Sequence, residues 1–143
     1  MGELKQRVQA VIREKQLTSL LNRTKWERLQ KSVIEELAFP PAYQIKYVLE
    51  NRPYPESFEQ DVWYWGDWEE GLEPFYHIEW IRVRPRYVKK RGKISEGEII
   101  DITEEFIRLL RKWRIPFVVK KESIYIYGYV KHADVFYVDC HKE

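Results

Sequence analysis

The sequence predicts an α+β domain, in which a single, mainly antiparallel β-sheet of five or six strands carries about three helices on one face. Two observations predict this class. Apolar residues recur at helical spacing in some segments, whereas other segments show the two-residue alternation that is typical of half-buried strands. The predicted order is two helices, three strands, one helix and then two or three strands, which favours one antiparallel sheet covered on one side.

The first two helices are predicted near the N-terminus. Residues 3–15 form an amphipathic pattern, with apolar residues three or four positions apart. The second helix is predicted to begin at Thr24, because Thr24 and Glu27 have the capping-box spacing, in which each side chain satisfies a free backbone N–H. Pro40 and Pro41 end it.

A third helix is predicted between the strands. It is expected to be capped by Asp101 or Thr103, and it carries acids in its first turn and bases in its last. Alternating and β-rich residues identify the strands. The predicted strands are residues 43–49, 62–65, 75–84, 117–119 and 124–130, with a short last strand at residues 135–138.

Composition predicts one small domain without a membrane segment. The chain has 143 residues and a hydrophobic fraction of 44%, which is enough for one packed core. Charged residues make up 34% of the chain but leave a net charge of only +2, which argues against a generic nucleic-acid binder. Cys140 is the only cysteine, and neither a signal peptide nor a membrane-length apolar run is present. We therefore expect a cytoplasmic protein with no membrane partner.

The most unusual stretch is the acidic aromatic ribbon, residues 61–81, which holds four of the six tryptophans. Between residues 53 and 81 there are eight acids and no lysine or arginine. Trp80 is interpreted as a core residue of its strand, whereas Trp68 falls in a predicted loop among acids and is expected to be exposed. Exposed rings surrounded by acids are typical of a binding site for a basic protein partner. The candidate partner-binding residues are Asp61, Trp65, Asp67, Trp68, Glu69, Glu70 and Glu73.

The segment that follows the ribbon supports a second hypothesis. Residues 82–93 contain seven basic residues and no acid. Together with the alternating Tyr125, Tyr127 and Tyr129 they predict a stacking platform beside a phosphate groove, although the motifs of common RNA-binding modules are missing. The alternative nucleic-acid-binding residues are Arg82, Arg84, Arg86, Lys89, Lys90, Arg91 and Lys93.

A third hypothesis is a hydrolase. His77 and Glu79 alternate on the third predicted strand, and with Asp67 they would form a general acid–base group. The C-terminal segment contains side chains that are able to bind metals, but none has the paired spacing of a zinc site, so neither a metal nor another cofactor is expected. These C-terminal residues are His132, Asp134, Asp139, Cys140 and His141.

Four blocks resemble an uncharacterised family of small bacterial proteins that is carried as a domain of unknown function. They are residues 22–29 (NRTKWERL), 41–47 (PAYQIKY), 78–81 (IEWI) and 124–129 (IYIYGY). The resemblance covers a family-like core (22–130) and leaves an N-terminal helical extension (1–21) and a tail or short last strand (131–143). The chain length predicts that residues 1–143 form a single domain. The resemblance supplies no activity and no catalytic residues.

Small α+β proteins of this kind resemble the immunity partners of secreted bacterial toxins, at the level of fold and size. The leading hypothesis is therefore a non-enzymatic, immunity-type inhibitor, whose acidic aromatic ribbon binds a basic partner.

Overall fold

The computed structural model describes residues 2–89 and 97–131 of the chain, and this part has the predicted α+β class. The expected strand at residues 135–138 lies outside the described residues. The helices are α1 (Gly2–Glu14), α2 (Arg23–Glu36), α3 (Thr103–Lys112) and the short 3₁₀ helix η1 (Phe75–His77). The strands are β1 (Thr18–Ser19), β2 (Ala42–Tyr47), β3 (Ile78–Arg84), β4 (Arg86–Lys89), β5 (Glu98–Asp101), β6 (Val118–Lys120), β7 (Ser123–Tyr127) and β8 (Tyr129–Val130).

The described strands form three antiparallel sheets, so the prediction of a single sheet of five or six strands is wrong. The largest sheet has the order β2-β3-β7-β6, while β4 pairs with β5 and β1 with β8. Pro85 separates β3 from β4, because proline has no N–H for a sheet hydrogen bond; its carbonyl accepts from Ile102 instead (2.8 Å). Gly128 separates β7 from β8 at a point where a Cβ atom would clash with the carbonyl oxygen of Ile78.

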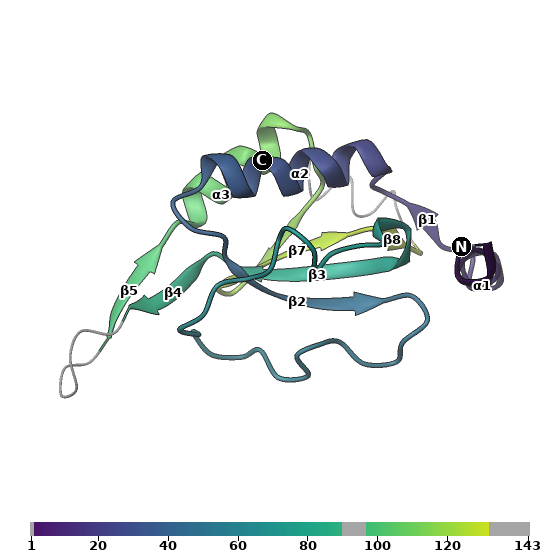
Figure 1. Cartoon of the computed structure of the whole chain (residues 1–143), viewed down its shortest axis with the longest axis horizontal. Helices are drawn as coiled ribbons and strands as arrows, with labels where there is room; N and C mark the ends of the chain where they lie inside the picture. The colour runs from purple at the N-terminus through teal and green to yellow at the C-terminus, as the bar shows by residue number, and fades with distance from the viewer. Residues whose placement is uncertain (1, 90–96, 132–143) are drawn as a thin grey trace.

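Two helices, α2 and α3, cover one face of the four-stranded sheet, and α1 stands beyond its end (Figure 1). The prediction that all three helices share one face is therefore wrong for α1. Within α1 only Val8 is buried, so its apolar stripe is too narrow to enter the main core. The core between α2, α3 and the sheet includes Trp26, Leu29, Val33, Ile81, Val83, Phe106, Leu110, Ile124 and Ile126.

Instead of the strand expected at residues 62–65, the chain forms a long loop between β2 and η1. This β2–β3 loop (residues 48–74) runs along the outer edge of β2 (Figure 1). Trp63, Tyr64 and Trp65 are all exposed, so they do not alternate between core and solvent as a half-buried strand would. A backbone pair ties the loop to the edge of β2, because Ile45 and Tyr54 exchange hydrogen bonds of 2.9 and 2.8 Å.

The start of α2 differs from the predicted capping box. Asn22 is the N-cap, and its side-chain oxygen accepts from the N–H of Lys25 (2.9 Å), whereas Thr24 lies inside the helix. At α3 the N-cap is Ile102, which makes no side-chain cap hydrogen bond, so neither Asp101 nor Thr103 is the N-cap that was predicted. Asp101 lies one residue before it, and its Oδ1 accepts from the N–H of Thr103 (2.8 Å) and from the Thr103 hydroxyl (2.6 Å).

The residues before α2 belong to the packed structure. Leu20 and Leu21 are buried in the core, and the N–H of Leu20 donates to the carbonyl of Gly128 (2.8 Å). None of the helices in the described ranges is long and apolar enough to cross a membrane.

The cap gives a first testable prediction. Replacing Asn22 with alanine leaves a helix N–H unsatisfied and should lower the free energy of unfolding by about 1 kcal/mol. Thr24→Ala is the matched control, because the exposed Thr24 makes no cap and its replacement should change stability by less than about 0.5 kcal/mol. Urea unfolding followed by circular dichroism measures both, and a larger loss for Thr24→Ala would contradict this assignment.

Candidate functional site

Trp68 fixes the β2–β3 loop from inside. Its side chain is only 1% exposed, and its indole Nε1 donates a hydrogen bond to the carbonyl of Pro41 (2.7 Å). The ring meets Tyr43 edge-on (5.3 Å between centroids) and also packs near Phe106 (6.3 Å). The prediction that Trp68 is an exposed contact residue is therefore wrong. The surrounding acids suggested exposure, but the loop turns the ring inward, where a backbone acceptor satisfies its N–H.

Further hydrogen bonds hold the loop backbone around this anchor. Gln30 on α2 donates to the carbonyls of Trp68 (2.7 Å) and Glu69 (3.1 Å). The hydroxyls of Tyr43 and Tyr47 donate to the carbonyls of Asp67 (2.5 Å) and Gly71 (3.1 Å). Because these side chains come from α2 and β2, the loop is fastened to both layers of the fold.

The same loop exposes large rings. Tyr54 is 75% exposed, Trp63 69%, Trp65 53% and Tyr64 39%. Among the described residues, seven large hydrophobic side chains are exposed, and these four lie within residues 54–65. Of the four, only Trp65 was a predicted site residue. The sequence does contain a signal that part of this cluster is exposed, namely three consecutive aromatic residues directly before Gly66. Neighbouring residues in a loop cannot all enter the core, so some of these rings must be exposed.

Trp65 lies at the edge of a groove between the loop and β2. This aromatic groove has a volume of about 590 Å³ and is lined by eleven residues, none of which is basic. Five of them are aromatic (Tyr43, Tyr47, Tyr54, Tyr64 and Trp65), and two are acidic (Glu50 and Asp67).

The acids make the groove electronegative. Burial, together with the charge of Asp67, raises the pKa of the Tyr43 hydroxyl far above its ordinary value. Burial and the charge of Glu50 raise the pKa of Tyr47 in the same way. Both phenols therefore stay neutral hydrogen-bond donors.

The other acids of the ribbon do not share this groove. Glu69 and Glu73 line a separate hollow of about 360 Å³ with Gln30 and Lys31 of α2. Glu70 is exposed on the loop, where its N–H donates to the carboxylate of Asp67 (3.1 Å). The predicted partner-binding acids are therefore distributed over two sides of the loop.

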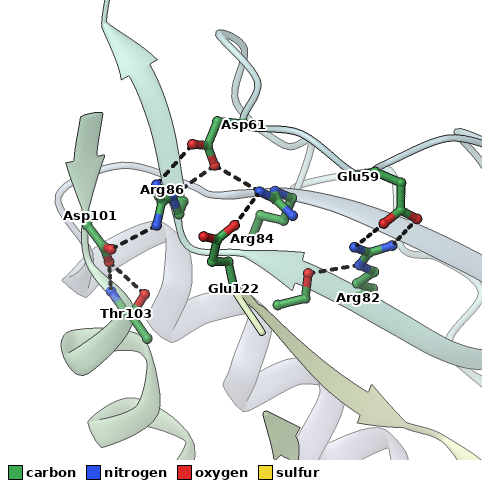
Figure 2. A network of polar contacts seen from close by, with 9 residues as sticks. Glu59, Asp61, Arg82, Arg84, Arg86, Asp101, Thr103 and Glu122 are labelled. Atoms are coloured by element: carbon green, nitrogen blue, oxygen red, sulfur yellow. Dashed lines mark hydrogen bonds and ion pairs between the residues drawn. The ribbon is translucent and has the colours of Figure 1, made fainter. Parts of the chain in front are cut away.

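Asp61, predicted as a partner contact, belongs to an internal ion-pair network (Figure 2). Its carboxylate accepts from Arg84 (2.9 Å) and from Arg86 (3.0 Å). Glu122 and Asp101 complete the network at 3.3 and 3.5 Å from these arginines. The Arg84 side chain is only 4% exposed, so Asp61 mainly neutralises a buried charge.

Acids also engage the three arginines that were predicted to line a phosphate groove. Arg82, Arg84 and Arg86 do reach the same side of the sheet, but Glu59 accepts from Arg82 (3.1 Å) and Asp61 accepts from the other two. Of the remaining candidates Lys89 is exposed at the end of β4. Lys90, Arg91 and Lys93 lie outside the described residues.

The three tyrosines of the predicted row do not form one continuous surface. Tyr125 and Tyr127 stack on the face of the sheet opposite the helices (6.1 Å, 16° between planes), and Lys120 lies 5.2 Å from the Tyr125 ring. Trp80, expected in the core, is half-buried beside Tyr125 (5.7 Å) on this open face. Tyr129 follows the bend at Gly128, and its hydroxyl donates to the carbonyl of Tyr76 (2.7 Å).

The predicted acid–base group is not assembled. His77 lies in η1 rather than on a strand, and its Nε2 accepts a hydrogen bond from the N–H of Leu49 (3.3 Å). Burial lowers the pKa of His77 below its ordinary value, against an opposing effect of Glu50. Glu79 is paired with Lys46 (2.6 Å), next to a register shift between β2 and β3. Residues 2–89 and 97–131 contain no cluster of three or more side chains suited to hold a metal.

The chain belongs to the family of unknown function DUF6678, whose model matches residues 8–133. The match begins within α1, so it extends further toward the N-terminus than the resemblance that the sequence blocks indicate. No curated protein and no solved structure shows significant similarity to the chain.

The anchor generates a second prediction. Trp68→Ala should cost about 3–5 kcal/mol of unfolding free energy, because it leaves a large cavity. Trp68→Phe keeps an aromatic ring but removes the donor to Pro41, and should cost about 1–3 kcal/mol. The exposed Trp63 is the control, and Trp63→Ala should change stability by less than about 0.5 kcal/mol. Chemical denaturation tests this order, and equal losses for Trp63→Ala and Trp68→Ala would contradict it.

The ion-pair network generates a third prediction, on pH dependence. Burial opposes ionisation of Asp61, but hydrogen bonds from Arg84 and Arg86 hold its pKa below the ordinary value of 3.8. A depressed folded-state pKa contributes stability above pH 3.8 that is lost as the pH falls through the folded-state pKa. Asp61→Asn should therefore cost about 2 kcal/mol at neutral pH. The difference from the natural chain should shrink in acid.

The measurement is urea unfolding of both proteins between neutral and acid pH. Glu70→Gln is the control, because that side chain is exposed, and its difference from the natural chain should stay near zero. An Asp61→Asn difference that stays constant or widens below pH 3.8 would contradict the role given to this carboxylate.

Proposed function

We propose that this protein is a non-enzymatic binding domain, which docks a basic protein partner on the β2–β3 loop. The observation that carries the proposal is the cluster of exposed Tyr54, Trp63, Tyr64 and Trp65 on one anchored loop. Clustered exposed apolar surface is unusual on a monomer and marks interaction sites. Tyrosine and tryptophan are also the residues that contribute most to binding hot spots.

The anchoring contacts support a binding role for these rings. Trp68, Gln30 and Tyr43 hold the loop through hydrogen bonds to both layers of the fold. A loop that is ordered before binding loses less conformational entropy in the complex, so more of the contact energy appears as affinity.

The negative charge of the loop indicates that the partner carries positive charge. Asp67, Glu69, Glu70 and Glu73 are exposed on the loop, and the sequence from residue 53 to 81 contains no lysine or arginine. Such a surface attracts a basic partner and accelerates its association at low salt.

An immunity-type inhibitor is the specific form of this function that we propose. Carboxylates can occupy the positions at which a nuclease or similar basic enzyme binds phosphates, while the rings exclude water from its active site. In this form the protein would act in the cytoplasm and neutralise one cognate enzyme by covering its site.

A nucleic-acid-associated domain is the second candidate. Its supporting observation is the stacked pair Tyr125 and Tyr127 on the open face, with Trp80 and Lys120 beside it. Stacked rings next to a cation are suited to bases of a single strand. Pairing of the nearby Arg82 with Glu59 reduces the positive charge that phosphates would need.

The fourth prediction tests the proposed function with a pull-down from source cells, eluted by a salt step, followed by kinetics with the captured protein. Trp63→Ala and Trp65→Ala should each raise the off-rate and cost about 2 kcal/mol or more of binding free energy. Neutralising Asp67, Glu69 and Glu70 to amides should slow the on-rate and flatten its salt dependence.

A matched control neutralises Glu3, Glu14 and Glu105, which changes the net charge equally but lies outside the loop. It should leave the on-rate nearly unchanged. Recovery of nucleic acid that survives the loop changes but is lost on neutralising Lys89, Lys90 and Arg91 would overturn the proposal and favour the second candidate.

A further inference from the structure

We infer that the aromatic groove between β2 and the β2–β3 loop is a binding pocket for the guanidinium group of a partner's arginine side chain. The inference rests on the proposed function and names the chemical group that this surface recognises. It assigns separate tasks to the two parts of the surface: Trp63 provides exposed contact area, and the groove selects a cation.

The shape of the groove is suited to one long side chain. Its volume of about 590 Å³ is bounded by Tyr43 and Tyr47 from β2 and by Tyr54, Tyr64 and Trp65 from the loop. An extended aliphatic stem can lie along these rings while its charged end reaches the acids. The faces of aromatic rings carry partial negative charge and attract cations, and an arginine plane also stacks on them.

The walls of the groove are fixed before a ligand arrives. The hydroxyls of Tyr43 and Tyr47 are held by the carbonyls of Asp67 and Gly71. Tyr47 lies against His77 (4.7 Å between ring centroids), and Trp65 stacks on Phe39 (6.1 Å). Gly71 is required here, because a Cβ atom would clash with the hydroxyl of Tyr43.

The charge of the groove selects a cation. Glu50 and Asp67 both line it, and no lysine, arginine or histidine of the described residues does. In the ion-pair network, by contrast, Asp61 is already neutralised by Arg84 and Arg86. The carboxylate of Asp67 accepts from the Glu70 N–H (3.1 Å), an arrangement that leaves its negative charge in place.

Guanidinium fits better than ammonium for two reasons. It is planar and stacks on tyrosine and tryptophan, and it is more weakly hydrated, so entering a half-enclosed groove costs it less free energy. Its fork of five donors can also reach two carboxylates at once, which a compact ammonium group does less well.

The fifth prediction tests the pocket without the partner. N-acetyl-arginine amide is titrated into ¹⁵N-labelled full-length protein and followed by NMR. It should bind in the millimolar range and shift the indole N–H of Trp65 and the amides of Gly66 and Gly71. The indole N–H of Trp113, which donates to Ser32 between α3 and α2, is the internal reference and should not move.

Matched ligands and variants make the test specific. N-acetyl-citrulline amide, a neutral isostere, should bind at least about tenfold more weakly, and N-acetyl-lysine amide about threefold more weakly. Glu50→Gln, Asp67→Asn and Tyr54→Leu should each weaken arginine binding about threefold to tenfold. Tyr54→Leu keeps the backbone pair with Ile45 and removes an exposed ring, so the fold survives. Glu14→Gln on α1 should have no effect.

Two outcomes would overturn the inference: no shift of the groove signals at tens of millimolar ligand, or equal binding of the citrulline amide. Either result would leave the proposed function in place if a captured partner still depends on Trp63. Conversely, the groove could bind arginine while the affinity for the captured partner is unchanged by Trp63→Ala and Trp65→Ala. That result would contradict the proposed function but not the arginine pocket.

Discussion

The hydrogen bond from the indole of Trp68 to the carbonyl of Pro41 fixes the loop that carries every exposed ring of the candidate surface. Residues 48–74 have no helix or strand of their own, so their order depends on contacts with β2 and α2 and with residues of β3 and β4. Once Trp68 is buried, the carbonyl of Asp67 lies within hydrogen-bond reach of the Tyr43 hydroxyl, while Trp63 and Trp65 stay exposed. The same packing therefore orders the loop and exposes Trp63 and Trp65.

Two opposite charge runs that adjoin in the sequence are partly paired in the fold. Arg82 and Arg84 on β3 and Arg86 on β4 reach acids of the preceding loop (Figure 2). Arg84 is buried there only because its charge is compensated, since an unpaired buried charge would be strongly destabilising. The acids that follow Asp61 in the loop are not paired with these arginines. They determine the electrostatic character of the loop surface.

Periodic segments could be predicted from the sequence, and the loop could not. The first helix was expected at residues 3–15 and found at Gly2–Glu14, and the expected strand at 43–49 is β2 (Ala42–Tyr47). These segments have a local pattern of apolar residues that fixes the buried side. The burial of Trp68 instead depends on an acceptor 27 residues away, and the pairing of Asp61 depends on Arg84, 23 residues away. Neither of these distant partners can be recognised from the local pattern of apolar and polar residues.

In the described part of the chain two accessible aromatic surfaces remain, and the charged residues around them distinguish them. On the open face, Trp80, Tyr125 and Tyr127 lie among cations of which Lys46 and Arg82 are already paired with acids. A phosphate backbone gains affinity mainly from cations that replace its counterions, so paired cations contribute little. The lining of the aromatic groove has the opposite composition, because it includes Glu50 and Asp67 and none of the described residues that line it is basic. The charge that remains after internal pairing, rather than the run of charges in the sequence, therefore favours a basic protein partner at the loop.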